Sequence, residues 1–145
     1  KKFIEHFNPK KVAMINDEIG KNSLIYHAKC GISFEYGKDG SKTALNEIIK
    51  DIKIIMAKLG MTDYPHINKN TTEFFKIIGA VNKNGCLQLG AEIVNFNPVE
   101  KGQVIAENGG KKIIAEESFY PVLFGEKNYK DIFGFMAKKT GKFFK

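Results

Sequence analysis

Apolar residues recur at helical spacing over one long segment near the middle of the chain. Between residues 41 and 59 they lie three and four positions apart and form one broad stripe, made of Leu45, Ile48, Ile49, Ile52, Ile55, Met56 and Leu59. Ser41 or Thr43 can cap the start, and Gly60 stands where a helix C-terminus prefers glycine. The pattern predicts a helix over residues 41–59 with one apolar face.

Two short apolar runs before this helix have the length of strands. Residues 11–16 form the first run and are followed by the turn-like residues 16–20. Residues 31–37 form the second run, in which apolar and polar side chains alternate between flanking glycines. Two such runs near each other favour strands of a buried sheet.

Beyond residue 61 the pattern changes from helical to β. Residues 62–70 are polar, contain proline and asparagine, and are typical of a linker. Residues 71–81 are rich in Thr, Phe and Ile, which favours a strand. The dipeptide Asn84-Gly85 then predicts a two-residue hairpin that leads into a strand over residues 86–89.

The last third of the chain continues the β pattern. Residues 104–106 and 113–115 flank the turn residues 108–110 and predict a second hairpin. Residues 119–124 form another short run, and Pro121 within it indicates an edge strand or a strand end. From Glu126 onward we expect a helical turn followed by a frayed, lysine-rich tail. The pattern therefore divides the chain into an α/β part over residues 1–68 and a β-rich lobe over residues 69–145.

Composition narrows the class of protein. The 145 residues suit one ordinary domain or two small lobes, and a hydrophobic fraction of 43% is enough for a globular core. No apolar run approaches the roughly 18–20 residues that span a bilayer, and the N-terminus resembles no secretory signal. Cys30 and Cys86 have no CxxC neighbour and are expected to be reduced thiols in a cytoplasmic protein. The chain lacks an initiator Met, so we expect it to begin inside a longer protein.

The positive charge does not indicate a nucleic-acid partner. The net charge is +7, but all 23 basic residues are lysines, spread along the chain without a basic block. Without arginine, the chain lacks the commonest side chain for reading base edges. A nucleic-acid binder is therefore disfavoured.

Few side chains stand out as candidates for chemistry. Glu35 occupies the polar register of an apolar run next to Gly37, where burial would raise its pKa and suit it to proton transfer. From pattern alone, an edge-strand glutamate facing water is the favoured alternative. His6, His27 and His66 lie far apart without metal-ligand spacing. The residues themselves therefore define no metal site.

Three segments together resemble the succinylglutamate desuccinylase/aspartoacylase family. Tyr120-Pro121-Val122, followed by Glu126 and Tyr129, resembles the family's Tyr-Pro-Val segment with its acidic residue and substrate-contacting tyrosine. Residues 97–103 are similar to the family's turn before that region. Residues 28–37 resemble the strand ending in the family's Glu-x-Gly, whose glutamate is catalytic, and the helix after it falls where the family has one. The resemblance covers nearly the whole chain, with gaps.

The resemblance implies an α/β fold class: the C-terminal part of a carboxypeptidase-like zinc-hydrolase domain, followed by a β-rich lobe that shapes the substrate pocket. The reaction would be hydrolysis of a small-molecule N-acyl amino acid, of the N-acyl-aspartate or N-succinyl-glutamate type. Glu35 would act as general base and then acid, and Tyr129 would donate a hydrogen bond to substrate. Glu126 would orient its loop. Zinc would polarise the amide carbonyl and activate water.

The chain departs from the family pattern in two respects. The family's zinc ligands, an HxxE pair and a later histidine, belong to the half preceding this sequence, so the isolated chain is expected to be inactive. Where a carboxylate-clamping arginine is expected, the chain has Leu24-Ile25-Tyr26. The alternative to an enzyme is a non-enzymatic protein-binding module, and Tyr129 could equally be a packed surface tyrosine. Apolar surface left bare by a missing half could also drive homo-oligomer formation.

Overall fold

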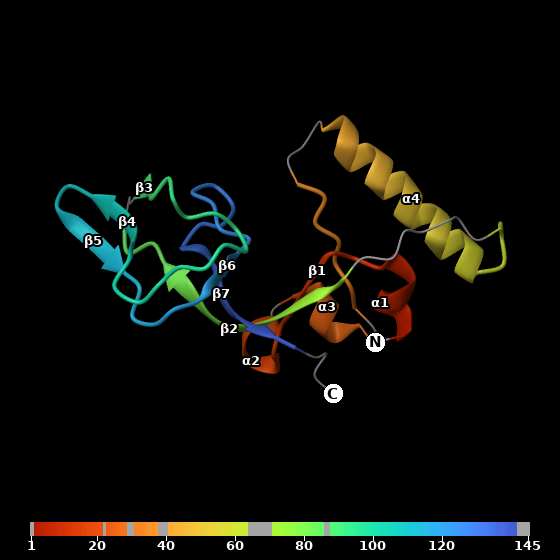
Figure 1. Ribbon diagram of the computed structural model, residues 1–145, viewed down its shortest axis with the longest axis horizontal. Helices are drawn as coiled ribbons and strands as arrows, with labels where there is room; N and C mark the ends of the chain where they lie inside the picture. Colours follow the sequence, from red (N-terminus) through yellow and green to blue (C-terminus); the bar gives the residue numbers. More distant parts are fainter. Residues whose placement is uncertain are drawn as a thin grey trace. The chain divides into compact units, whose positions relative to one another are not determined.

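The computed structural model describes residues 2–21, 23–28, 31–37, 41–63, 71–85 and 88–141 (Figure 1). The chain forms two compact units, each described here by itself. The first comprises Lys1–Lys11 and Lys21–Thr72, and the second comprises Val12–Gly20 and Glu73–Lys145. The predicted boundary at residue 68 lies outside the described residues, as do His66, Cys30 and Cys86.

The first unit is built from helices. It contains α1 (Lys2–Phe7), α3 (Leu24–His27) and the long α4 (Lys42–Lys58), which Figure 1 shows as one unbroken helix. At the start of α4 the Ser41 hydroxyl accepts a hydrogen bond from the Ala44 N–H at 3.3 Å. At its end Gly60 has φ +73, and the Met61 N–H donates to the Met56 carbonyl at 2.9 Å, as in a Schellman motif. The predicted long helix and both of its end signals are therefore confirmed.

The apolar stripe of α4 is not the face that the first unit buries. Ile54 is fully buried, with 0% of its surface exposed. Several stripe residues remain exposed instead: Leu45, Ile49, Ile52, Ile55 and Leu59. Among the described residues, α4 therefore packs through the face that carries Ile54, and most of its apolar stripe is exposed.

The predicted strand over residues 31–37 is wrong. These residues are extended and their side chains alternate between exposed and half-buried, but they form no strand. The alternation that suggested a sheet reflects contacts with helices, since Phe34 packs on Phe7 of α1 with ring centroids 4.7 Å apart. Tyr36 is hydrogen-bonded to Asp51 of α4. An extended segment can thus bury alternate side chains without pairing.

The second unit is built on two sheets together with the short α2 (Asp17–Gly20). The pairs β2–β7, β6–β7, β3–β4 and β4–β5 are antiparallel. One sheet has the strand order β1-β2-β7-β6, formed by β1 (Lys11–Met14), β2 (Glu73–Asn82), β7 (Ile132–Thr140) and β6 (Tyr120–Val122). The other has the order β3-β4-β5, formed by β3 (Gln88–Leu89), β4 (Val104–Asn108) and β5 (Lys111–Ile114). Within the described residues no helix is long and apolar enough to cross a membrane.

Three strand predictions in this unit are confirmed. β4 and β5 form the predicted hairpin, with Asn108 paired to Lys111 and Gly109 and Gly110 at positive φ between them. β2 covers the predicted run. β6 lies at the edge of its sheet, which explains how the strand tolerates Pro121.

Two predictions in this unit are wrong. β2 does not form a hairpin through Asn84-Gly85 with the next strand. It lies between β1 and β7, and β3 belongs to the other sheet. The segment after Glu126 does not become a helical, frayed tail: after a short turn it enters β7, which pairs with β2 from Phe74↔Thr140 to Asn82↔Ile132. The sequence signal that indicates this strand is the period-two spacing of Phe133 and Phe135, which the expectation of a tail did not take into account.

The core of the second unit lies in two apolar clusters. One gathers Val81, Ile93, Val99, Ile105, Ala106, Ala115, Phe119, Phe124 and Phe133. The other gathers Phe75, Ile77, Val122 and Ala137. A register shift between Ile77 and Gly79 lets β2 supply both clusters, because one extra residue reverses which face the following side chains occupy.

Candidate active site

Glu35 lies in the first unit, in the extended segment between α3 and α4. Its side chain is exposed, so the burial that its place in an apolar run suggested is not found in the described residues. The Ser33 hydroxyl donates a hydrogen bond to its Oε1 at 3.3 Å. Its two sequence neighbours turn the other way: Phe34 packs on Phe7, and Tyr36 lies parallel to Phe34 at 6.1 Å between ring centroids. The aromatic contacts therefore fix the backbone on both sides of Glu35 and project its carboxylate away from them.

Two glycines delimit this segment for steric reasons. A Cβ at Gly31 would lie 2.1 Å from the Ile25 carbonyl oxygen, so the chain passes too close to α3 for any side chain there. Gly37, the glycine of the Glu-x-Gly motif, has φ +90, which glycine adopts without strain. The motif therefore combines a carboxylate with a left-handed turn directly after it.

Tyr36 anchors the segment to α4. Its hydroxyl donates to Asp51 Oδ2 at 2.8 Å. Burial raises the pKa of Tyr36 above the ordinary tyrosine value, and the hydrogen bond to Asp51 and its negative charge raise it further. The phenol therefore stays protonated and continues to donate well into the alkaline range. Asp51 was not singled out by sequence reasoning, because it lies on the polar side of the helix like many solvated residues.

Tyr129 lies in the second unit, in the connection between β6 and β7. It is half-buried, and its ring meets Phe135 edge-on with centroids 5.5 Å apart. Its backbone carbonyl accepts a hydrogen bond from the Lys83 ammonium. Three residues earlier, the Glu126 carboxylate accepts from the Leu89 N–H at 3.0 Å. This contact ties Glu126 to Leu89, and its role in orienting the loop stays a prediction.

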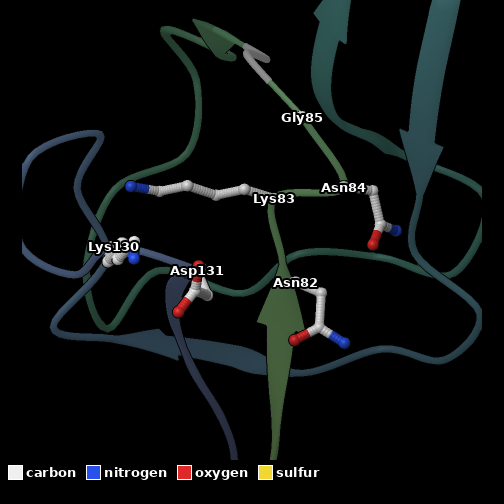
Figure 2. Close-up of a pocket in the computed structure, with 6 residues that line it drawn as sticks. All are labelled: Asn82, Lys83, Asn84, Gly85, Lys130 and Asp131. Atoms are coloured by element: carbon white, nitrogen blue, oxygen red, sulfur yellow. The ribbon is translucent and has the colours of Figure 1, made fainter.

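A shallow pocket of about 500 Å³ lies at the end of β2, next to this connection. It is lined by Asn82, Lys83, Asn84, Gly85, Lys130 and Asp131 (Figure 2). Figure 2 shows the Lys83 side chain extended away from the side chain of Asn84. The pocket is open, and apart from Gly85 its lining residues are polar or charged. No sequence signal distinguished Lys83 from the other lysines.

The described residues do not supply a metal site. Nowhere in them do three His, Cys, Asp or Glu side chains gather closely enough to hold a metal ion. His27 is used locally, with its Nε2 3.0 Å from the Lys21 carbonyl oxygen. The two predicted site residues belong to different units, Glu35 to the first and Tyr129 to the second. The donor set of the described residues therefore does not fit zinc by itself.

Comparison with known proteins identifies the fold. No family model matches the chain, and no curated protein matches its sequence. The structure is nevertheless similar to that of murine aminoacylase 3, with a TM-score of 0.61 and 14% identity over 95% of this chain and 55% of that chain. A variant of murine aminoacylase 3 with one glutamate replaced by alanine matches over the same shares, with a TM-score of 0.60 and 13% identity. The predicted likeness is confirmed for the fold: the chain has a mixed α/β fold and spans about half the length of these aminoacylase structures.

Proposed function

We propose that this chain is the C-terminal part of an amide hydrolase that removes the acyl group from an N-acyl amino acid, giving a carboxylate and a free amine. The observation that carries the proposal is the fold shared with aminoacylase 3 over 95% of the chain. The Glu-x-Gly and Tyr-Pro-Val segments add to it, because both stand in the order of the family that the sequence resembles. The first unit is then the end of a carboxypeptidase-like domain.

Glu35 is the proposed proton carrier. It accepts a proton from the attacking water and passes it to the leaving nitrogen, so that the amine departs uncharged. Two features support this role. Its carboxylate points away from the aromatic contacts of its neighbours, and the Ser33 hydroxyl at 3.3 Å already donates to it. A carboxylate on a backbone held by Phe34 and Tyr36 keeps its position during the reaction.

Tyr129 is the proposed substrate contact of the second lobe, where its hydroxyl donates a hydrogen bond to the bound substrate. Its ring is held edge-on by Phe135 and its backbone by Lys83, so little conformational freedom is left to lose on binding. Because the chain contains no arginine, any arginine that clamps the substrate carboxylate would have to come from polypeptide outside this chain.

Zinc is proposed as the cofactor, with ligands outside this chain, because the family that the sequence resembles has its HxxE pair and later histidine in the preceding half. The isolated chain is accordingly expected to be inactive. Its substrates are proposed to be small molecules of the N-acyl-aspartate or N-succinyl-glutamate type.

The experiment uses the protein as the cell makes it. Release of free amine from N-acetyl-aspartate and N-succinyl-glutamate is measured with an amine-reactive fluorophore. Glu35→Gln should lower kcat about 100- to 10,000-fold, the usual contribution of general acid–base catalysis. Glu47→Gln, which neutralises an exposed carboxylate on α4, is the matched control and should leave kcat unchanged. A Glu35→Gln variant that keeps the wild-type kcat would show that Glu35 is not the proton carrier.

A second candidate function, a non-enzymatic protein-binding module, is favoured by one observation. Leu45, Ile52 and Leu59 on α4 are 56%, 49% and 70% exposed, which is an unusual density of bare aliphatic side chains on one helix. The double substitution Leu45→Lys and Ile52→Lys tests this candidate function, with association measured by light scattering. Loss of association in a protein that hydrolyses neither substrate would favour the binding module.

A further inference from the structure

Lys83 lies immediately after β2 and lines this pocket. Its backbone N–H donates to the Asp131 carbonyl at 2.9 Å, so it extends the pairing of β2 with the chain entering β7. Asn84 and Gly85 follow with φ 48 and φ 114, and turn the chain away from the sheet. The backbone of Lys83 is therefore held by the sheet on one side and a turn on the other.

The ammonium of Lys83 reaches the connection that carries Tyr129. Its Nζ donates to the Glu126 carbonyl at 2.7 Å and to the Tyr129 carbonyl. It also lies 5.8 Å from the centre of the Phe133 ring, which is fully buried. A lysine ammonium has three donors and no acceptor, so two carbonyls on one short turn suit it well. The contacts of a charged donor are stronger than those of a neutral one.

We infer that Lys83 is a positioning residue for Tyr129: its ammonium clamps both ends of residues 126–129 and thereby sets where the tyrosine hydroxyl stands. This inference rests on the proposed function only in what Tyr129 does for substrate. The clamp itself follows from the contacts of Lys83 with the carbonyls of Glu126 and Tyr129.

The clamp does not act alone on the tyrosine. The Lys83 ammonium holds the backbone of Tyr129, whereas Phe135 holds its ring edge-on at 5.5 Å. The Glu126 carboxylate ties the first residue of the turn to Leu89 at 3.0 Å. Loss of the ammonium therefore removes its hydrogen bond to the backbone carbonyl of residue 129, while the ring contact and the Glu126 contact remain. The tyrosine should then be displaced rather than released.

The test reads the position of the tyrosine directly. 3-Fluorotyrosine replaces Tyr129 in the full chain, and its ¹⁹F resonance is followed. Lys83→Met, which keeps the apolar stem and removes the donors, should shift and broaden that resonance. Lys83→Arg, which restores a charged donor, should return it towards its original position. Lys112→Met, which removes a surface ammonium paired with Glu107 on the other sheet, is the control and should have no effect.

An unchanged resonance in Lys83→Met overturns the inference. If that variant does not fold by circular dichroism, Lys83→Leu replaces it, because leucine also lacks a donor. In the protein as the cell makes it, Lys83→Met should raise KM about three- to tenfold with kcat nearly constant, the scale of one misplaced hydrogen bond.

The two readouts separate the clamp from the function. A shifted resonance in a protein that hydrolyses no N-acyl amino acid supports the clamp and contradicts the proposed function. A shifted resonance with unchanged KM in an active protein overturns the role of Tyr129 in substrate binding. Rescue of KM by Lys83→Arg supports both.

Discussion

Replacing Ile54 by alanine should destabilise the first unit far more than the same change at Ile52 on the same helix. Ile54 is 0% exposed, whereas Ile52 is 49% exposed. Truncating isoleucine to alanine removes three carbons, about 2.5 kcal/mol of transfer free energy at about 0.8 kcal/mol per buried carbon. A cavity adds to this at a fully buried site, giving about 2–5 kcal/mol for Ile54→Ala. Ile52→Ala should cost about 1 kcal/mol.

The pair is matched because the gain in helix propensity on changing isoleucine to alanine is the same at both positions. Stability is measured by urea unfolding, followed by the circular dichroism of the helices, because the chain contains no tryptophan for fluorescence. A difference of about 2 kcal/mol separates the two midpoints by roughly 1 M urea at a typical slope. The slopes should be equal, since neither variant changes the surface exposed on unfolding.

Equal losses at Ile54 and Ile52 would refute the reasoning. They would mean that the exposed stripe of α4 is covered in solution, by a second copy or by other polypeptide. Dilution distinguishes these cases, because a stripe covered by a second copy makes the midpoint depend on protein concentration.

Three further predictions concern the single residues Tyr36, Gly37 and Glu126. Burial and the hydrogen bond to Asp51 raise the pKa of Tyr36 in the folded state. The contribution of Tyr36 to stability is therefore complete below about pH 10, where the unfolded tyrosine is also protonated. This contribution is lost as the pH rises beyond that value. Unfolding free energies between pH 8 and 11 should therefore fall more steeply in the wild type than in Tyr36→Phe. Gly37→Ala should lower the free energy of unfolding by about 1 kcal/mol, because the residue has a φ of +90. Gly141→Ala, where the Cβ meets open space, is the control and should lower it little. Equal losses would contradict the strain argument. Glu126→Ala should speed amide hydrogen exchange at Leu89, while Glu126→Gln, which keeps an acceptor oxygen, should not.

The predictions that succeeded rest on signals carried by a few neighbouring residues. α4 begins at the Ser41 cap and ends at Gly60, and both features depend on local backbone geometry. The β4–β5 hairpin follows from the two glycines that its turn requires. Pro121 lacks the N–H of an interior strand, so its edge position was also readable.

For the candidate site, the sequence indicated which residues to examine but not their surroundings. Glu35 and Tyr129 stood in recognisable segments, and their roles stay predictions. Alternation around Glu35 suggested a buried strand, yet alternate burial arises here from contacts with helices that are distant in sequence. Lys83 lies 46 residues from Tyr129, so no local pattern could relate its ammonium to that carbonyl.

The sequence by itself determined where α4, the β4–β5 turn and the edge strand β6 lie, because propensity, capping and turn geometry act over a few residues. Only the tertiary structure decided which strands pair and which face of α4 is buried. β2 pairs with β7, which places Phe74 opposite Thr140, instead of turning back at Asn84-Gly85. That choice depends on the apolar surface that the whole sheet buries, and this surface exists only once distant segments have come together.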